Sequence, residues 1–181
     1  MKTYAALLRA VNLGSKNKVS MPELRELFVA LGAEDVATYV QSGNVVFRSR
    51  ATSSDELKQT IEKQLSRDLG LTATVLLRTN AELARIAGGS PFEQPDPKKL
   101  HVTFLAEKPE RARVRELEAI EFPPDEFRVS GREVYLHCPD GYGRSKLSNA
   151  YFEKQLGVVG TTRNWNTVTK LAELTSGLAK R

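Results

Sequence analysis

The stretch "SMPELRELFVALGAEDVATYVQSGNVVF" (residues 20–47) decides the fold, because it joins one helix to a β-hairpin. Ser20 and Glu23 have the spacing of a capping box, which is typical of a helix N-terminus. Leucine and phenylalanine then recur at helical spacing until Gly32, where we expect the helix to end. Alternating apolar residues on both sides of the turn "QSGN" (41–44) predict two antiparallel strands.

The flanking residues complete a larger unit. An apolar run at 3–11 predicts a strand before the helix, and "TATVLLR" (72–78) predicts a fourth strand. Between the hairpin and that last strand, residues 53–70 have a serine cap, apolar residues at helical spacing and a terminal glycine. The predicted order is β-α-β-β-α-β, followed by a short helix at 79–89.

The second half of the chain repeats this order without repeating the sequence. It has a strand at "HVTFLA" (101–106), a helix that opens at Pro109, a hairpin around Gly131, a helix stopped by Gly157 and a strand at "VVGTTR" (158–163). A final amphipathic helix follows. We therefore expect an α+β fold in which two ferredoxin-like (β-α-β-β-α-β) halves pack together.

A proline-rich stretch marks the expected boundary between the halves. "SPFEQPDPKK" (90–99) carries three prolines in ten residues, which favours a connector. We expect an N-terminal ferredoxin-like half at 1–89 and a C-terminal ferredoxin-like half at 100–181.

Composition bounds the class of protein. With 181 residues, 40% of them apolar and 27% charged, the chain is typical of globular proteins. Cys138 is the only cysteine, which excludes an intrachain disulfide and fits a reducing compartment. The sequence has no apolar stretch of about 18 residues, so we expect no membrane association and a cytoplasmic location. With His101, His137 and Cys138 as the only soft or borderline ligands, we expect no metal and no cofactor.

The positive charge of the chain is concentrated. Its formal net charge is +5, yet outside four short segments 20 bases face 22 acids. The segments are 7–21, 39–47, 141–149 and 158–170, and they contain no acid. Their bases are Arg9, Lys16, Lys18, Arg144, Lys146, Arg163 and Lys170. Bases gathered among amide, hydroxyl and glycine neighbours are typical of a surface that receives an anion.

The predicted topology brings these segments together in pairs. In a β-α-β-β-α-β unit the first two strands run in the same direction, so "NLGSKNK" (12–18) should lie beside "QSGN". The last two strands also run in the same direction, so "DGYGRSK" (140–146) and "TTRNWN" (161–166) should share an edge. The result is one basic patch in each half, and whether the two form one site depends on how the halves pack.

The first patch offers a strand-to-helix loop. Gly14 would let a ligand approach the backbone, Lys16 and Lys18 supply point charges, and Asn12, Ser15 and Asn17 supply hydrogen-bonding groups. The following helix N-terminus also favours anions, but the loop lacks the P-loop pattern. The alternative is an ordinary loop of turn-forming residues.

The turn "QSGN" adds two uncharged candidates to that patch, Ser42 and Asn44. The main alternative for them is structural, with Gly43 or Asn44 at positive φ to turn the hairpin. Ser42 has no base near it in sequence that would make it a nucleophile.

The second patch combines a glycine-rich loop with the end of a strand. Arg144 can place two donors on a phosphate, Lys146 can act as a compact charge, and Ser145 can donate a hydrogen bond. Arg163, Asn164 and Trp165 are the other candidates. Trp165 can stack on a base or sugar, or else anchor the packing of its helix. Asn164 or Asn166 can instead cap that helix.

The four segments also carry a family resemblance. "LLRAVNLGSKNKVSM" (7–21), "YVQSGNVVF" (39–47), "GRSKLSN" (143–149) and "TTRNWNTVTKL" (161–171) closely resemble the bacterial domain-of-unknown-function family numbered 1697, in the same order and over nearly the whole chain. The resemblance implies an α+β fold and brings no established catalytic residues.

These observations favour an uncharacterised protein with an anion- or phosphate-binding face for a nucleotide or phosphorylated small molecule. One alternative is a nucleic-acid-binding module, which would bind less tightly as salt increases. The others are an enzyme of unknown reaction that uses the same basic loops, and an interaction module that meets an acidic protein. No residue pattern identifies a catalytic group.

Overall fold

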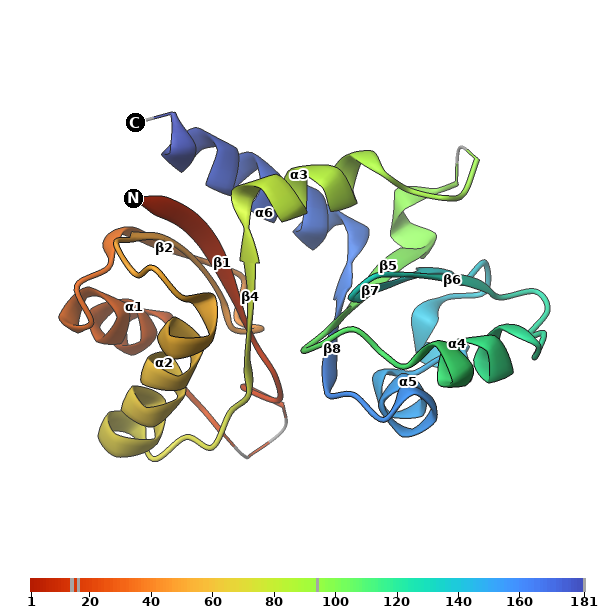
Figure 1. Cartoon of the computed structure of the whole chain (residues 1–181), viewed down its shortest axis with the longest axis horizontal. Coiled ribbons are helices and arrows are strands. Elements are labelled where there is room, and N and C mark those ends of the chain that lie inside the picture. The colour runs from red at the N-terminus through yellow and green to blue at the C-terminus, as the bar shows by residue number, and fades with distance from the viewer. Residues whose placement is uncertain (14, 16, 94, 181) are drawn as a thin grey trace. The chain divides into compact units, whose positions relative to one another are not determined.

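The computed structural model describes residues 1–181 apart from 14, 16, 94 and 181 (Figure 1). Its described part is a mixed α+β protein with two four-stranded antiparallel sheets and six α-helices. Contacts between Cα atoms divide the chain into unit 1 (1–85 with 170–181) and unit 2 (86–169). In the described part of the chain, no helix has the length and apolar character needed to span a membrane.

Unit 1 holds the first sheet, in the strand order β2-β3-β1-β4. Its elements are β1 (Lys2–Leu8), α1 (Met21–Ala30), β2 (Glu34–Tyr39), β3 (Asn44–Ser49), α2 (Ser54–Leu69), β4 (Val75–Thr79) and the start of α3 (Asn80–Gly88). Since β1 and β2 both pair antiparallel with β3, they run in the same direction. The end of β1 and the β2–β3 turn therefore meet at one edge of the sheet.

Helix boundaries in unit 1 follow the predicted caps. The Ser20 hydroxyl accepts from the Glu23 N–H at 3.3 Å, and the Glu23 carboxylate accepts from the Ser20 N–H at 3.0 Å, which completes the capping box. Ser53 caps α2, and Gly70 ends it in the left-handed conformation at φ 62°. Local sequence signals thus determine where both helices begin and end.

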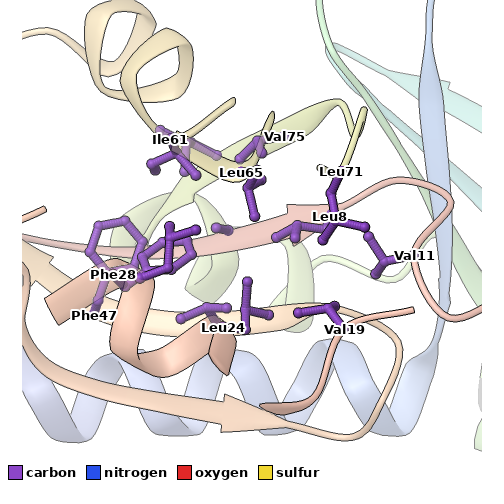
Figure 2. Close-up of a cluster of buried hydrophobic side chains, with 14 of the residues drawn as sticks. Leu8, Val11, Val19, Leu24, Phe28, Phe47, Ile61, Leu65, Leu71 and Val75 are labelled. Carbon is purple, nitrogen blue, oxygen red and sulfur yellow. The ribbon is translucent and has the colours of Figure 1, made fainter. Parts of the chain in front are cut away.

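The core of unit 1 lies between the sheet and its two helices, α1 and α2 (Figures 1 and 2). Leu24 and Phe28, four residues apart on α1, and Ile61 and Leu65 on α2 point into it. The Phe28 ring meets the edge of Phe47 with 4.9 Å between centroids. Burying each such side chain contributes about 1.5–3 kcal/mol, so the core holds β1 and its following loop in place.

Unit 2 holds the second sheet, in the strand order β6-β7-β5-β8. Its elements are the 3₁₀ helix η1 (Pro97–Lys99), β5 (Leu100–Leu105), α4 (Arg111–Glu118), β6 (Glu126–Ser130), β7 (Glu133–His137), the 3₁₀ helix η2 (Tyr142–Arg144), α5 (Asn149–Leu156), β8 (Gly160–Asn164) and the start of α6 (Trp165–Ala179). α4 and α5 cover one face of this sheet (Figure 1). Both β7 and β8 pair antiparallel with β5, so their C-terminal ends lie at the same edge.

The element order predicted from the sequence is confirmed in both halves, including hairpin turns at 40–43 and 131–132. Three details differ. β1 ends at Leu8, because the chain turns at the next residues and Ala10 takes a positive φ of 60°. The short 3₁₀ helices were not predicted, since 3₁₀ turns have little sequence signature. Residues 170–181 group with unit 1, because the packing of a terminal helix depends on long-range contacts that periodicity does not encode.

Candidate functional site

Asn12 joins the loop after β1 to the β2–β3 turn. Its Oδ1 accepts from the Val19 N–H at 2.9 Å, and its Nδ2 donates to the carbonyls of Val19 at 3.0 Å and Gln41 at 2.8 Å. Its backbone has a φ of 54°, which asparagine tolerates better than most residues. The predicted neighbourhood of "NLGSKNK" and "QSGN" is confirmed, and the amide that we expected to meet a ligand holds the two loops together.

Gly43 allows the β2–β3 turn to lie close against the end of β1. At φ 75°, an added Cβ would lie 2.4 Å from Val11 Cγ2 and 2.9 Å from Leu8 Cβ, closer than van der Waals contact allows. The Leu8 N–H donates to the Gly43 carbonyl at 2.8 Å. Only glycine fits between the end of β1 and the hairpin turn.

The other candidates of the first patch differ in exposure. Asn44 is fully buried, and its Nδ2 donates to the Tyr39 carbonyl at 3.0 Å and to the Ser42 hydroxyl at 2.9 Å. This pattern gives Asn44 a structural role in the turn. Arg9 is half-buried, and its N–H donates to the Thr74 carbonyl at 2.8 Å.

Lys18 is exposed, which leaves its ammonium accessible from solvent. Gly14 and Lys16 lie outside the described residues. The described part of this patch is therefore a tightly hydrogen-bonded loop in which Lys18 is the exposed base.

Arg163 of the second patch is buried, with 8% of its surface exposed. Its Nη1 donates to the Thr161 hydroxyl at 2.7 Å and to the Thr162 carbonyl at 3.0 Å. Burial lowers the pKa of the guanidinium to about 10. A base near the end of a strand was expected at the surface, but its position in the strand directs the side chain to a buried face.

Asn164 and Trp165 start α6. The Asn164 Oδ1 accepts from the Thr167 N–H at 2.8 Å, which confirms the capping alternative for this asparagine. The Trp165 ring lies 6.5 Å from the ring of Tyr135 and is half-buried, as expected for a packing anchor. The structure thus gives both residues a role at the strand-to-helix junction.

Arg144, Ser145 and Lys146 line a cavity of about 420 Å³ within unit 2, which we call the Arg144 cavity. Its lining residues are Glu121, Phe122, Pro123, Pro124, Asp125, Asp140, Gly141, Arg144, Ser145 and Lys146. The side chains of Arg144 and Lys146 are exposed, and neither forms an ion pair with any described residue. An unpaired guanidinium and an unpaired ammonium at one cavity are what an anionic group requires.

Ser145 fixes the loop that carries the two bases. Its hydroxyl donates to Asp125 Oδ2 at 2.6 Å and accepts from the Leu147 N–H at 3.0 Å. Burial raises the pKa of the nearby Cys138 thiol, the Asp125 carboxylate raises it further, and the hydrogen bond with Ser145 lowers it. The thiol therefore stays protonated at neutral pH and is a poor nucleophile.

A second contact holds η2 against β5. The rings of His101 and Tyr142 stack with 4.5 Å between centroids, and the Tyr142 hydroxyl accepts from the Asn149 N–H at 3.1 Å. Burial lowers the pKa of His101, so the imidazole is neutral at neutral pH. Together with the Ser145 hydrogen bonds, these contacts fix the backbone that carries Arg144 and Lys146.

The Arg144 cavity also carries three carboxylates, from Glu121, Asp125 and Asp140. The sequence does not indicate these carboxylates, because Glu121 and Asp125 belong to the α4–β6 connection and only Asp140 lies next to the basic segment. The charges within the cavity are mixed, with two positive and three negative groups. Among the described residues, no group of three or more His, Cys, Asp and Glu side chains is arranged to hold a metal ion.

Comparisons with known proteins place the chain in a family. The model of a family described as "Protein of unknown function (DUF1697)" matches residues 1–135. A conserved bacterial protein from Streptococcus pneumoniae, known from its solved structure, shares the fold with a TM-score of 0.76 and 24% identity. The alignment covers 96% of this chain and 98% of that one. A search of curated proteins gave no match.

The family match covers half of the residues that line the Arg144 cavity. The loop with Arg144 and Lys146 follows residue 135, beyond the matched region, although Glu121 and Asp125 lie within it. The matched region spans all of the first sheet and most of the second. The chain therefore belongs to the family of proteins of unknown function described as DUF1697.

Proposed function

We propose that the protein binds a nucleotide or another phosphorylated small molecule in the Arg144 cavity. The observation that carries the proposal is the pair of exposed bases, Arg144 and Lys146, which line one cavity without an ion-pair partner among the described residues. A guanidinium can place two parallel N–H donors on phosphate oxygens, and an ammonium adds a compact charge.

The rest of the cavity suits the remainder of such a ligand. The carboxylates of Glu121 and Asp140 can accept hydrogen bonds from sugar hydroxyls or amino groups. Phe122, Pro123 and Pro124 provide an apolar wall for a base or another apolar body. A volume of about 420 Å³ lies within the range of small-molecule sites.

The same charges argue against a nucleic-acid partner. A polyanion that passes three carboxylates would be repelled along most of its length, whereas one phosphate group can sit at the two bases alone. If the partner were a nucleic acid, contacts to several phosphates would make the logarithm of the binding constant fall linearly with the logarithm of the salt concentration. A ligand with a single anionic group is the better fit.

Three further expectations complete the proposal. We infer that each half, at 1–89 and 100–181, contains a ferredoxin-like unit, because the two sheets have equivalent strand orders and each has two helices on one face. Residues 170–181 group with unit 1 and lie outside the second ferredoxin-like unit. We also propose the exposed Lys18 as an anion contact of the first patch. A cytoplasmic location is consistent with the single buried cysteine.

The test is calorimetric titration of the whole chain with adenosine monophosphate and, separately, with inorganic phosphate. Arg144→Lys keeps the charge and loses the paired donors, so affinity should fall roughly ten- to a hundredfold, the equivalent of one charge-assisted hydrogen bond. Arg115→Lys, an exposed arginine of α4 outside the cavity, is the matched control and should bind as the wild type does. Equal affinities for all three proteins, or no binding by the wild type, would contradict the proposal.

A further inference from the structure

A second cavity of about 650 Å³ lies in unit 2, and we call it the Phe127 cavity. Its lining residues are Glu118, Ile120, Glu121, Phe122, Pro123, Pro124, Asp125, Glu126, Phe127 and Arg128. Half of these are apolar. The cavity shares the segment 121–125 with the Arg144 cavity but contains neither Arg144 nor Lys146.

The apolar wall of this cavity is aromatic and held in place from behind. The Phe122 ring meets Phe127 and Tyr151 at steep angles, with 6.3 Å and 5.5 Å between centroids. Phe127 in turn meets Phe152, which is fully buried. Ile120 is 44% exposed, whereas Phe127 is buried with 8% of its surface exposed. The wall is therefore a firm apolar surface that solvent reaches.

The charges of the cavity have one dominant sign. Four carboxylates line it, and among the described residues Glu118, Glu121 and Asp125 form no ion pair. The fourth, Glu126, has an oxygen 4.0 Å from His137 Nδ1. Acidic groups around an apolar wall concentrate the negative potential in the hollow.

The single base of the cavity is already engaged. The Arg128 Nη1 donates to the Phe127 carbonyl at 2.8 Å, and its guanidinium carbon lies 6.0 Å from the centre of the Phe92 ring. These contacts keep the guanidinium beside β6 and Phe92, and it forms no ion pair with Glu118 or Glu121 among the described residues. The cavity keeps an excess of negative charge beside an apolar wall.

We propose that the Phe127 cavity binds a small organic cation, an amine with an apolar body. The ammonium would be attracted by the carboxylates and by the face of Phe122, while the apolar body would cover Ile120 and the prolines. The volume is that of a small-molecule site. A cation is favoured by the charge complementarity, and an apolar body is favoured by the exposed wall.

The two cavities share the wall at 121–125, so a nucleotide and an amine would compete for it, but the bases that would bind phosphate do not line the Phe127 cavity. The two proposals can therefore fail separately. An amine should bind the Arg144→Lys protein as well as it binds the wild type. Loss of phosphate binding with retained amine binding would leave the cation site intact.

The experiment is an NMR titration of the full chain with benzylamine and with its neutral analogue, benzyl alcohol. Because both compounds have the same aromatic ring, the difference between their affinities measures the contribution of the ammonium group. We expect the amine to bind at least about tenfold more tightly than the alcohol, since two or more carboxylates act on one charge. Amide shifts should centre on residues 120–128.

Charge-removing variants complete the test. Glu118→Gln and Glu121→Gln should each weaken benzylamine binding about threefold, and the double variant about tenfold, as expected for partly exposed ion pairs. Glu107→Gln removes an exposed acid of the same unit outside the cavity and should change nothing. Equal binding of amine and alcohol, or an effect of Glu107→Gln as large as that of Glu121→Gln, would overturn the proposal.

Discussion

Replacing Asn12 should destabilise unit 1 more than any surface substitution of similar size. Its side chain makes three hydrogen bonds that join the β1 loop to the hairpin turn. At about 0.5–1.5 kcal/mol each, their loss in Asn12→Gly should lower the free energy of unfolding by about 3 kcal/mol. Asn12→Ala should lose about 1 kcal/mol more, because the backbone φ of 54° is strained for alanine and free for glycine.

The assay is urea unfolding followed by circular dichroism, together with hydrogen exchange of the Val19 amide, which donates to Asn12 Oδ1. Protection of that amide should fall in both Asn12 variants. Asn166→Ala is the matched control, since Asn166 is exposed on α6 and alanine favours helices. A loss of unfolding free energy below about 1 kcal/mol, the contribution of a single such hydrogen bond, would refute the view that Asn12 holds the two loops together.

Three other predictions concern stability. Gly43→Ala should lower the unfolding free energy by about 3 kcal/mol or more in urea titrations, because its Cβ would overlap Val11 and Leu8 and its φ is positive. Ser20→Ala should cost about 1 kcal/mol by the same measurement, since it removes the cap of α1; the hydrogen bonds from Ser20 also hold the pKa of Glu23 below its usual value. Burial lowers the pKa of His101, so the unfolded chain binds a proton before the folded one does, and stability should fall as pH decreases below about 6.5. His101→Phe should have a shallower decline, measured as the urea midpoint between about pH 7.5 and about pH 5.5; an unchanged slope would show that the imidazole is not the group responsible.

Local chemistry allowed much of the fold to be predicted. The Ser20–Glu23 box, the glycine after α2 and the "QSGN" turn each act within a few residues, so their sequence patterns identify them without knowledge of the tertiary structure. The neighbourhood of the β1 loop and the hairpin turn also follows from strand direction alone. These parts of the prediction are confirmed.

The candidate site could be predicted only in part, because burial and charge neighbours depend on distant residues. Arg163 looks like a surface base in sequence, but it is buried in the folded chain. Asn12 and Asn44 look like ligand donors, and their amides are used to join backbone segments. Glu121 lines the Arg144 cavity although it precedes Arg144 by more than twenty residues and belongs to the α4–β6 connection. No local motif indicates that the two residues meet.

The most direct test of the central claim, that Arg144 and Lys146 bind a phosphate group, is an NMR titration of the isotope-labelled chain with inorganic phosphate and then with adenosine monophosphate. We predict amide shifts at 140–146 with both ligands, and additional shifts at 121–125 with the nucleotide, because the sugar and base would extend along that wall. In Arg144→Lys these shifts should require roughly ten- to a hundredfold more ligand. Shifts confined to the loop at 12–19, or no shifts at 140–146, would contradict the assignment of the phosphate site to this cavity.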